Sequence, residues 1–234
     1  MANTNGSFGL KPYGMLGSAP NSTGTTEYRI ASTNSNPIFQ GMAVIPLASG
    51  VIDDLQAAAG GSVSIVGVFN GCEYVSSTTG EVVRSNYWPG SGADSNHPVK
   101  AFLYDSPSQL FTIATSNVVS AANTEAEIRA AVFANIQMAT GNSGSTTTGI
   151  SSATADLNTI ATTNTHALRI MGILDDPENS DFTAAGIPLI VRINNHFNAP
   201  TGSIAQGTVS TTAYKEAQLW LFLAHNWRKS WSLA

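Results

Sequence analysis

The sequence predicts a mainly β protein built around a single barrel-like or sandwich-like domain. Short runs of β-branched and aromatic residues recur between Gly, Pro, Asn and Asp, which is the pattern of strands separated by turns. Ser, Thr, Asn and Gly together supply 90 of the 234 residues, whereas charged residues supply only 11%, less than half of the roughly 25% in ordinary soluble domains. A chain of this length can form one large β domain or two small ones, and we favour a single domain.

The strand pattern begins at Pro37 and defines a predicted β domain over residues 37–198. Asn70-Gly71 and Thr79-Gly80 lie between apolar runs, and we predict a hairpin turn at each because Asn and Gly tolerate positive φ. The block 37–115 is expected to form a small barrel or sandwich by itself, against which the later strands pack. The predicted strands cover residues 38–47, 63–69, 72–76, 82–87, 99–104, 110–114, 167–174 and 187–194.

Residues 123–138 fit two structures. Thr124 and Glu127 have the spacing of a capping box, and the Ala-rich sequence that follows can form a helix, although Val132, Ile136 and Met138 also fit a strand. We expect a short helical turn over residues 124–130 that leads into a strand. Residues 140–165 are poor in apolar side chains and rich in turn formers, so they are expected to form a long surface loop.

Residues 1–36 contain five glycines among Asn, Ser and Thr and only isolated apolar residues. Neither a helical nor a strand period is sustained there. A disordered tail is one interpretation; an extended arm that places its apolar side chains on a neighbouring subunit is the other, because burial must offset the entropy of ordering the chain. We favour the arm, in a homo-oligomer that is a trimer or a dimer. Its predicted interface residues are Phe8, Leu10, Tyr13 and Leu16.

The C-terminal segment, residues 199–234, is rich in aromatic residues. Apolar residues between positions 212 and 231 fall on helical spacing, but the sequence LWLFL is apolar on every side of such a helix. Such a segment must be covered, either by a groove of its own β domain or by a partner subunit. Whether it is helical is left open. The interface residues predicted here are Trp220, Phe222, Trp227 and Trp231.

Composition and motifs exclude several functional classes. A net charge of −5 and a pI of about 5.2 disfavour nucleic-acid binding, which needs a basic surface. No apolar run is long enough to span a membrane, and no secretory signal is visible, so we expect synthesis in the cytoplasm of the producing cell.

The single cysteine, Cys72, lies in an apolar run and is expected to be buried and inert.

The chain shows no motif for catalysis. It contains neither a phosphate-binding glycine loop nor GxSxG, and its four histidines are too dispersed for a metal site. The acidic run 175–181 lacks the spacing of a calcium loop and is expected to be a solvated turn. We therefore predict no enzyme activity, no cofactor and no metal. Trp88, with the amide-rich loops, leaves a carbohydrate-binding alternative open.

Seven segments, in this order, resemble a group of structural proteins of tailed bacteriophages, namely the capsid decoration, cement or minor capsid proteins. The resemblance covers about residues 9–198 and leaves 212–234 outside the pattern. The segments are GLKPYGMLGSAPNSTGTTEYRI (9–30), NPIFQGMAVIPLASGVI (36–52), VSIVGVFNGCEYV (63–75), VKAFLYDSPSQLFTI (99–113), NIQMATGNSGSTTTGISSATADLNT (135–159), LRIMGILDDPENS (168–180) and IPLIVRINNHF (187–197).

The resemblance implies a barrel-centred protein on the outer surface of a virion. Such a protein binds the major capsid protein and stabilises the capsid lattice, without touching nucleic acid or membrane. A host-glycan binding module on the virion head or tail is the alternative function. Deletion of residues 1–30 of the arm is expected to leave a folded protein that occupies capsids poorly.

Overall fold

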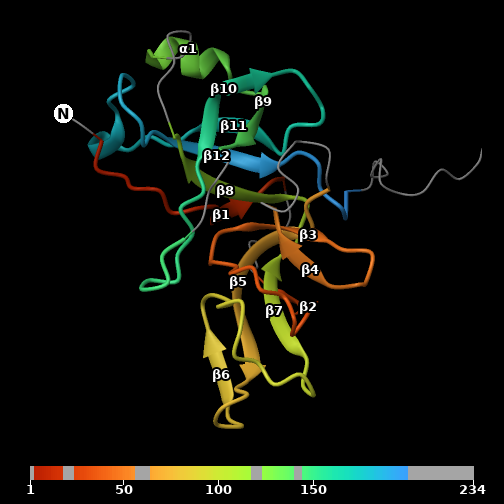
Figure 1. The fold of residues 1–234 in the computed structure, drawn as a ribbon. Coiled ribbons are helices and arrows are strands. Elements are labelled where there is room, and N and C mark those ends of the chain that lie inside the picture. Colours follow the sequence, from red (N-terminus) through yellow and green to blue (C-terminus); the bar gives the residue numbers. More distant parts are fainter. Residues whose placement is uncertain (1–2, 18–23, 56–63, 117–122, 140–143, 200–234) are drawn as a thin grey trace, which may run out of the picture. The chain divides into compact units, whose positions relative to one another are not determined.

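The computed structural model describes residues 3–17, 24–55, 64–116, 123–139 and 144–199. Met1–Pro200 form one compact unit. The fold is mainly β, as predicted, and its strands form a closed barrel and a second sheet (Figure 1).

The barrel closes because its first and last strands pair with each other. Its strand order is β3-β4-β2-β7-β5, and β5 pairs back onto β3. All of these pairings are antiparallel except β2 with β4, which is parallel. A sixth strand, β6, pairs only with β5 and forms with it the hairpin that extends downward in Figure 1. The strands are β2 (Thr26–Ile30), β3 (Ala43–Pro46), β4 (Ile52–Asp54), β5 (Gly67–Val75), β6 (Val82–Ser85) and β7 (Val99–Tyr104).

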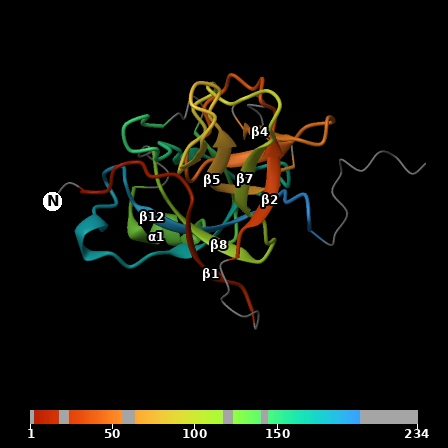
Figure 2. The same cartoon turned by 90° about the horizontal axis from the view of Figure 1, so that it is seen from below.

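The second sheet is antiparallel, with the strand order β1-β8-β12-β11-β9-β10. It curls so that Ala155, at the start of β10, forms a bridge with Thr115, just after β8. Figure 2 shows the same elements from below. The strands are β1 (Lys11–Met15), β8 (Gln109–Ala114), β9 (Asn135–Met138), β10 (Ala155–Ala161), β11 (Leu168–Ile173) and β12 (Pro188–Ile193).

The buried side chains form two hydrophobic cores, one inside the barrel and one that the second sheet shares with Ala43 of β3 and Val68 of β5. Alternation of buried and half-buried residues in β7 directs Val99, Ala101 and Leu103 into the barrel core. Phe111, Ile170 and Val191 belong to the core of the second sheet. Burying large aliphatic side chains of this kind contributes about 1.5–3 kcal/mol each.

The N-terminal segment differs from the expected arm, because both of its strands pair within the chain. β1 forms an edge of the second sheet beside β8, and β2 lies between β4 and β7 in the barrel. The described parts of this segment, residues 3–17 and 24–36, are therefore part of the β domain, and the block 37–115 does not close a barrel without β2. β8, at the end of that block, belongs to the second sheet.

Gly9 and Gly41 connect the N-terminal segment to the barrel. The N–H of Leu10 donates to the carbonyl of Gly41 at 2.8 Å, and a Cβ on Gly9 would lie 2.6 Å from that same oxygen. Both glycines have positive φ, a conformation that only glycine adopts at little cost. This close approach holds Leu10, which is 1% exposed, in the core of the second sheet.

Asn70-Gly71 does not form the predicted hairpin. The dipeptide lies inside β5, where Phe69 pairs with Leu103 and Gly71 with Phe102, so Asn70 is the extra residue of a β-bulge. A Cβ on Gly71 would lie 2.9 Å from the carbonyl of Ser85 on β6. Glycine is thus required by the close approach of two strands. The hairpin predicted at Thr79-Gly80 is confirmed by the antiparallel β5–β6 pair.

The helical turn predicted at residues 124–130 is confirmed as α1 (Glu125–Ala130). Thr124 is its N-cap, and the reciprocal bonds with Glu127 complete the capping box. These bonds satisfy backbone N–H groups that have no partner within the helix. Ile128 on this helix is fully buried, and β9 follows the helix as expected.

The predicted surface loop at residues 140–165 is wrong for its second half. Residues 155–161 form β10, the edge strand of the second sheet, and Leu157 is 2% exposed within the core. The acidic run forms the predicted turn between β11 and β12, as the short 3-10 helix η2 (Pro177–Asn179) capped by Asp176. Asn179 in this turn accepts the N–H of Asn5 at 2.7 Å.

Candidate docking surface

The four arm residues predicted as interface anchors lie in different surroundings. Leu10 is a core residue of its own chain, so its prediction as an intersubunit anchor is wrong. Phe8 is half-buried. Tyr13 and Leu16 are 51% and 39% exposed, which leaves them as candidates for contact with another molecule. The other four predicted anchors, Trp220, Phe222, Trp227 and Trp231, lie outside the described residues.

Tyr13 is exposed because of a β-bulge at the sheet edge. Pro12 pairs with Phe111 and Gly14 with Leu110, so Tyr13 is the extra residue on β1. A bulge turns the side chain away from the regular alternation, and together with Pro12 it makes the edge a poor template for further strand pairing. Contact through Tyr13 would therefore be made by its side chain.

Phe133, between α1 and β9, is the most exposed large apolar side chain in the described ranges. The residue as a whole is 73% exposed, and its φ is 74°. Within the same ranges no other non-glycine residue has positive φ, and a bulky residue there is a conformational outlier. The N–H of Phe133 donates to the carbonyl of Ile170 on β11 at 2.8 Å, so the fold holds this ring outward on a strained backbone.

The sequence did not indicate that Phe133 is exposed and is a candidate docking residue. In the sequence it stands in the apolar run AAVFANIQM, where nothing distinguishes it from the buried Ile128 and Ile136 on either side. Its exposure depends on the turn that reverses the chain between α1 and β9. That turn has no glycine or proline to mark it.

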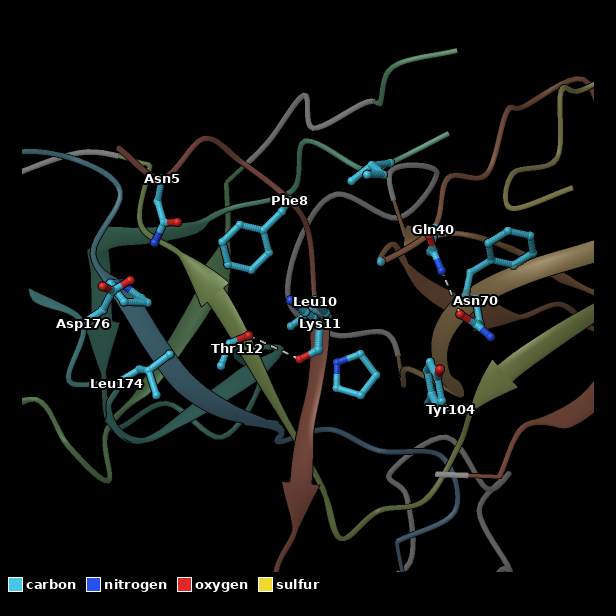
Figure 3. Close-up of a pocket in the computed structure, with 15 residues that line it drawn as sticks. Asn5, Phe8, Leu10, Lys11, Gln40, Asn70, Tyr104, Thr112, Leu174 and Asp176 are labelled. Atoms are coloured by element: carbon cyan, nitrogen blue, oxygen red, sulfur yellow. Dashed lines mark hydrogen bonds between the residues drawn. The ribbon is translucent and has the colours of Figure 1, made fainter. Parts of the chain in front are cut away.

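A groove of about 790 Å³ lies where the N-terminal segment passes between the two sheets (Figure 3). Phe8, Leu10 and Lys11 line its middle, where the side chain of Thr112 donates to the carbonyl of Lys11 at 3.4 Å. Leu174 and Asp176 line one side in Figure 3. Gln40, Asn70 and Tyr104 line the other.

The bulge in β5 contributes to this groove. Asn70 accepts a hydrogen bond from the side-chain amide of Gln40 at 2.9 Å, which fixes two neutral polar groups in the wall. With one lysine and one aspartate in its lining, the groove has no excess of either charge. It suits an apolar segment with neutral polar groups better than a charged ligand.

Trp88 is fully buried, and it therefore cannot serve as the sugar-stacking platform of the carbohydrate-binding alternative. Its indole N–H donates to the carbonyl of Asn34 at 3.2 Å, and its ring packs edge-on against Tyr74 with the centroids 5.4 Å apart. The other three tryptophans lie outside the described ranges. No described tryptophan supports glycan binding.

Cys72 is buried, as predicted, and burial raises its pKa to about 12. Its thiol donates to the carbonyl of Tyr87 at 3.3 Å. A thiol with so high a pKa is almost wholly protonated at neutral pH and is a poor nucleophile. Within the described ranges, no group of three or more His, Cys, Asp or Glu side chains could hold a metal ion.

His196 is a buried histidine at the junction of the two sheets. Its Nδ1 accepts the N–H of Asn198 at 3.0 Å, and its Nε2 has no hydrogen-bond partner among the described residues. Burial lowers the pKa of His196 to about 4; the charge of Arg192 lowers it further, while that of Asp105 opposes the shift. The folded protein therefore keeps this imidazole neutral.

This shift predicts a loss of stability in mild acid. Below pH 6.5 the unfolded chain binds a proton at His196 while the folded chain does not, until the pH approaches 4. The free energy of unfolding should fall across this window by at most about 3 kcal/mol from this residue. Denaturant unfolding of the wild type and of His196→Gln at pH 7 and pH 4.5 measures it, and His196→Gln should reduce the pH dependence. Equal pH dependence in the two proteins would contradict this account.

Neither the family models, nor the curated proteins, nor the solved structures compared with this chain gave a match. None of the helices in the described ranges has the length and apolarity needed to cross a membrane. The class of protein is thus defined by the fold itself: a mainly β, barrel-centred protein.

Proposed function

We propose that this chain is a structural protein of a bacteriophage particle, which binds the outside of the capsid and stabilises the capsid lattice without catalysing a reaction. The observation that supports a docking role is Phe133, an aromatic residue that is 73% exposed and has a φ of 74°. Natural proteins retain such strain mainly where it serves a function. The proposed partner, the major capsid protein, follows from the resemblance of the seven segments between residues 9 and 198 to capsid decoration, cement or minor capsid proteins.

The composition supports the same role. Ser, Thr, Asn and Gly supply 90 of 234 residues, so the surface offers many neutral hydrogen-bonding groups and few charges. A protein that binds the assembled lattice in preference to free subunits stabilises the assembly by mass action. Several weak contacts on one lattice then add up to tight attachment.

Sedimentation with empty capsids tests the proposal. Purified full-length protein is mixed with capsids that lack it, and the bound fraction is measured after pelleting. We expect saturable binding and a higher temperature of capsid disruption in the bound particles. Absence of binding at micromolar concentrations, or binding with no gain in capsid stability, would contradict the proposed function.

Replacing Phe133 should separate docking from folding. Phe133→Gly removes the ring and relieves the positive φ, so the free energy of unfolding should rise by about 1 kcal/mol. Capsid affinity should fall about tenfold, because an exposed aromatic anchor contributes roughly 1–3 kcal/mol to an interface. Denaturant unfolding and sedimentation measure the two effects.

Phe133→Tyr is the matched control, since it keeps the ring and the strain and should retain capsid affinity. Phe133→Asn keeps a residue that tolerates positive φ but removes the ring, and it should behave like Phe133→Gly. Unchanged affinity in both the Gly and the Asn variants would remove Phe133 from the docking surface.

A further inference from the structure

Two arginines face each other on neighbouring strands of the second sheet. Arg169 on β11 is the register partner of Arg192 on β12. Both are half-buried, whereas Ile170, Val191 and Ile193 beside them are buried in the core. Because side chains alternate along a strand, the two arginines lie together on the outer face of the sheet, opposite the core.

Neither guanidinium has an acidic partner in the described part of the chain. Arg169 donates from Nε to the side-chain oxygen of Asn135 at 2.9 Å, and Asn135 in turn donates to the carbonyl of Thr163 at 2.9 Å. These bonds orient Arg169 and use one of its five N–H groups. Arg192 makes no hydrogen bond to a described residue, and its Nε is buried. The ion pairs of the described residues involve other cations, namely Arg84, His97, Lys100 and Arg129.

The arrangement is unfavourable for the chain alone. Like charges directly opposite on paired strands repel each other, and a buried N–H without an acceptor loses the hydrogen bond that it makes with water. One anion between the two guanidinium groups removes both penalties. A carboxylate has the planar, two-oxygen geometry that a guanidinium binds through two parallel hydrogen bonds.

We propose that Arg169 and Arg192 form a binding site for one carboxylate group. Asn135 positions Arg169, and Arg192 supplies the unpartnered donor. A single carboxylate fits the charge of the molecule better than a polyanion, because residues 1–200 carry 14 acidic and seven basic side chains and repel extended negative charge. The site is independent of the proposed function, and it takes either an acidic side chain of a partner or a small carboxylic acid.

Titration of the full-length protein with sodium acetate tests the site, with sodium chloride at equal ionic strength as the reference. The readout is the NMR resonance of the arginine Nε–H groups. We expect a saturable shift in the wild type, with a dissociation constant of roughly 1–50 mM, and at least tenfold weaker binding in Arg169→Gln and in Arg192→Gln. Arg29→Gln is the matched control: Arg29 also faces a cation, Lys100, but Lys100 has two glutamates within 4 Å.

The Arg29 variant should bind acetate like the wild type. Both site variants should remain folded, because each removes a repulsion. A wild type without a saturable shift, or folded site variants that bind acetate as the wild type does, would overturn the proposal.

Sedimentation with capsids distinguishes the two sources of the carboxylate. If Arg169→Gln and Arg192→Gln lose acetate binding and also occupy capsids at least tenfold more weakly, the carboxylate belongs to the capsid. If they lose acetate binding with unchanged occupancy, the site takes a small carboxylic acid. Both results support the site, and the acetate titration remains informative if the wild type does not bind capsids at all.

Discussion

Deletion of residues 1–30 is expected to abolish folding. The deletion removes β2 from between β4 and β7, so the barrel cannot close, and it removes β1 from beside β8. It also removes Leu10 and Ile30, which are 1% and 3% exposed. Each lost side chain alone weakens a core by about 2–5 kcal/mol, which for two residues is comparable with the whole stability of a typical domain, about 5–15 kcal/mol.

Circular dichroism and limited proteolysis measure this outcome. The truncated chain should show no cooperative unfolding and should be digested throughout. A chain ending at Pro200 is the matched control, since it loses 34 residues from the other end but keeps the compact unit, and it should unfold cooperatively. A soluble, protease-resistant protein without residues 1–30 would show that the barrel closes without β2. It would restore the expectation of a separate arm.

Trp88→Ala is expected to lower the free energy of unfolding by about 3–5 kcal/mol. The substitution empties a fully buried site in the barrel core, removes the edge-on contact with Tyr74, and leaves the carbonyl of Asn34 without its donor. Trp88→Phe keeps much of the buried ring and should cost about half as much. Denaturant unfolding monitored by circular dichroism measures both.

The outcome for Trp88 also separates a structural role from a glycan-binding role. A residue that stacks against a sugar must be accessible, and its loss would change binding with little effect on stability. An alanine variant as stable as the wild type would therefore contradict the structural role derived from its burial.

Strands with regular alternation could be predicted from sequence, whereas strands with isolated apolar residues could not. In β7 the sequence VKAFLY alternates between buried and half-buried positions, and its predicted limits match those observed. In β1 the sequence KPYGM contains a proline, a glycine and a bulge. Its pairing partner, β8, is nearly 100 residues away, so local pattern carries no information about that strand.

Turn-forming residues alone do not decide between a hairpin turn and a bulge within a strand. Asn70-Gly71 fits a hairpin and a bulge equally well, and the choice is made by β3 and β7, which pair with the same continuous β5. Leu157 is the only large apolar residue at a buried position of β10. A single buried residue is too weak a signal to distinguish an edge strand from a loop.

The candidate site was less accessible to prediction than the fold. Tyr13 and Leu16 are exposed, as an interface requires, whereas Leu10 is a core residue of the same chain. The three residues have similar neighbours in the sequence. Their different exposure arises from the folded structure, in which a bulge turns Tyr13 outward. The positive φ of Phe133 and the pairing of Arg169 with Arg192 arise from tertiary structure, so sequence patterns do not indicate them.

The most direct test of the proposed function is electron cryo-microscopy of capsids that lack this protein, imaged before and after incubation with the full-length chain. The account predicts added density at regularly repeated positions on the outer surface, with the turn that carries Phe133 in contact with the capsid. Saturating protein without added density, or density in which Phe133 faces solvent, would contradict it.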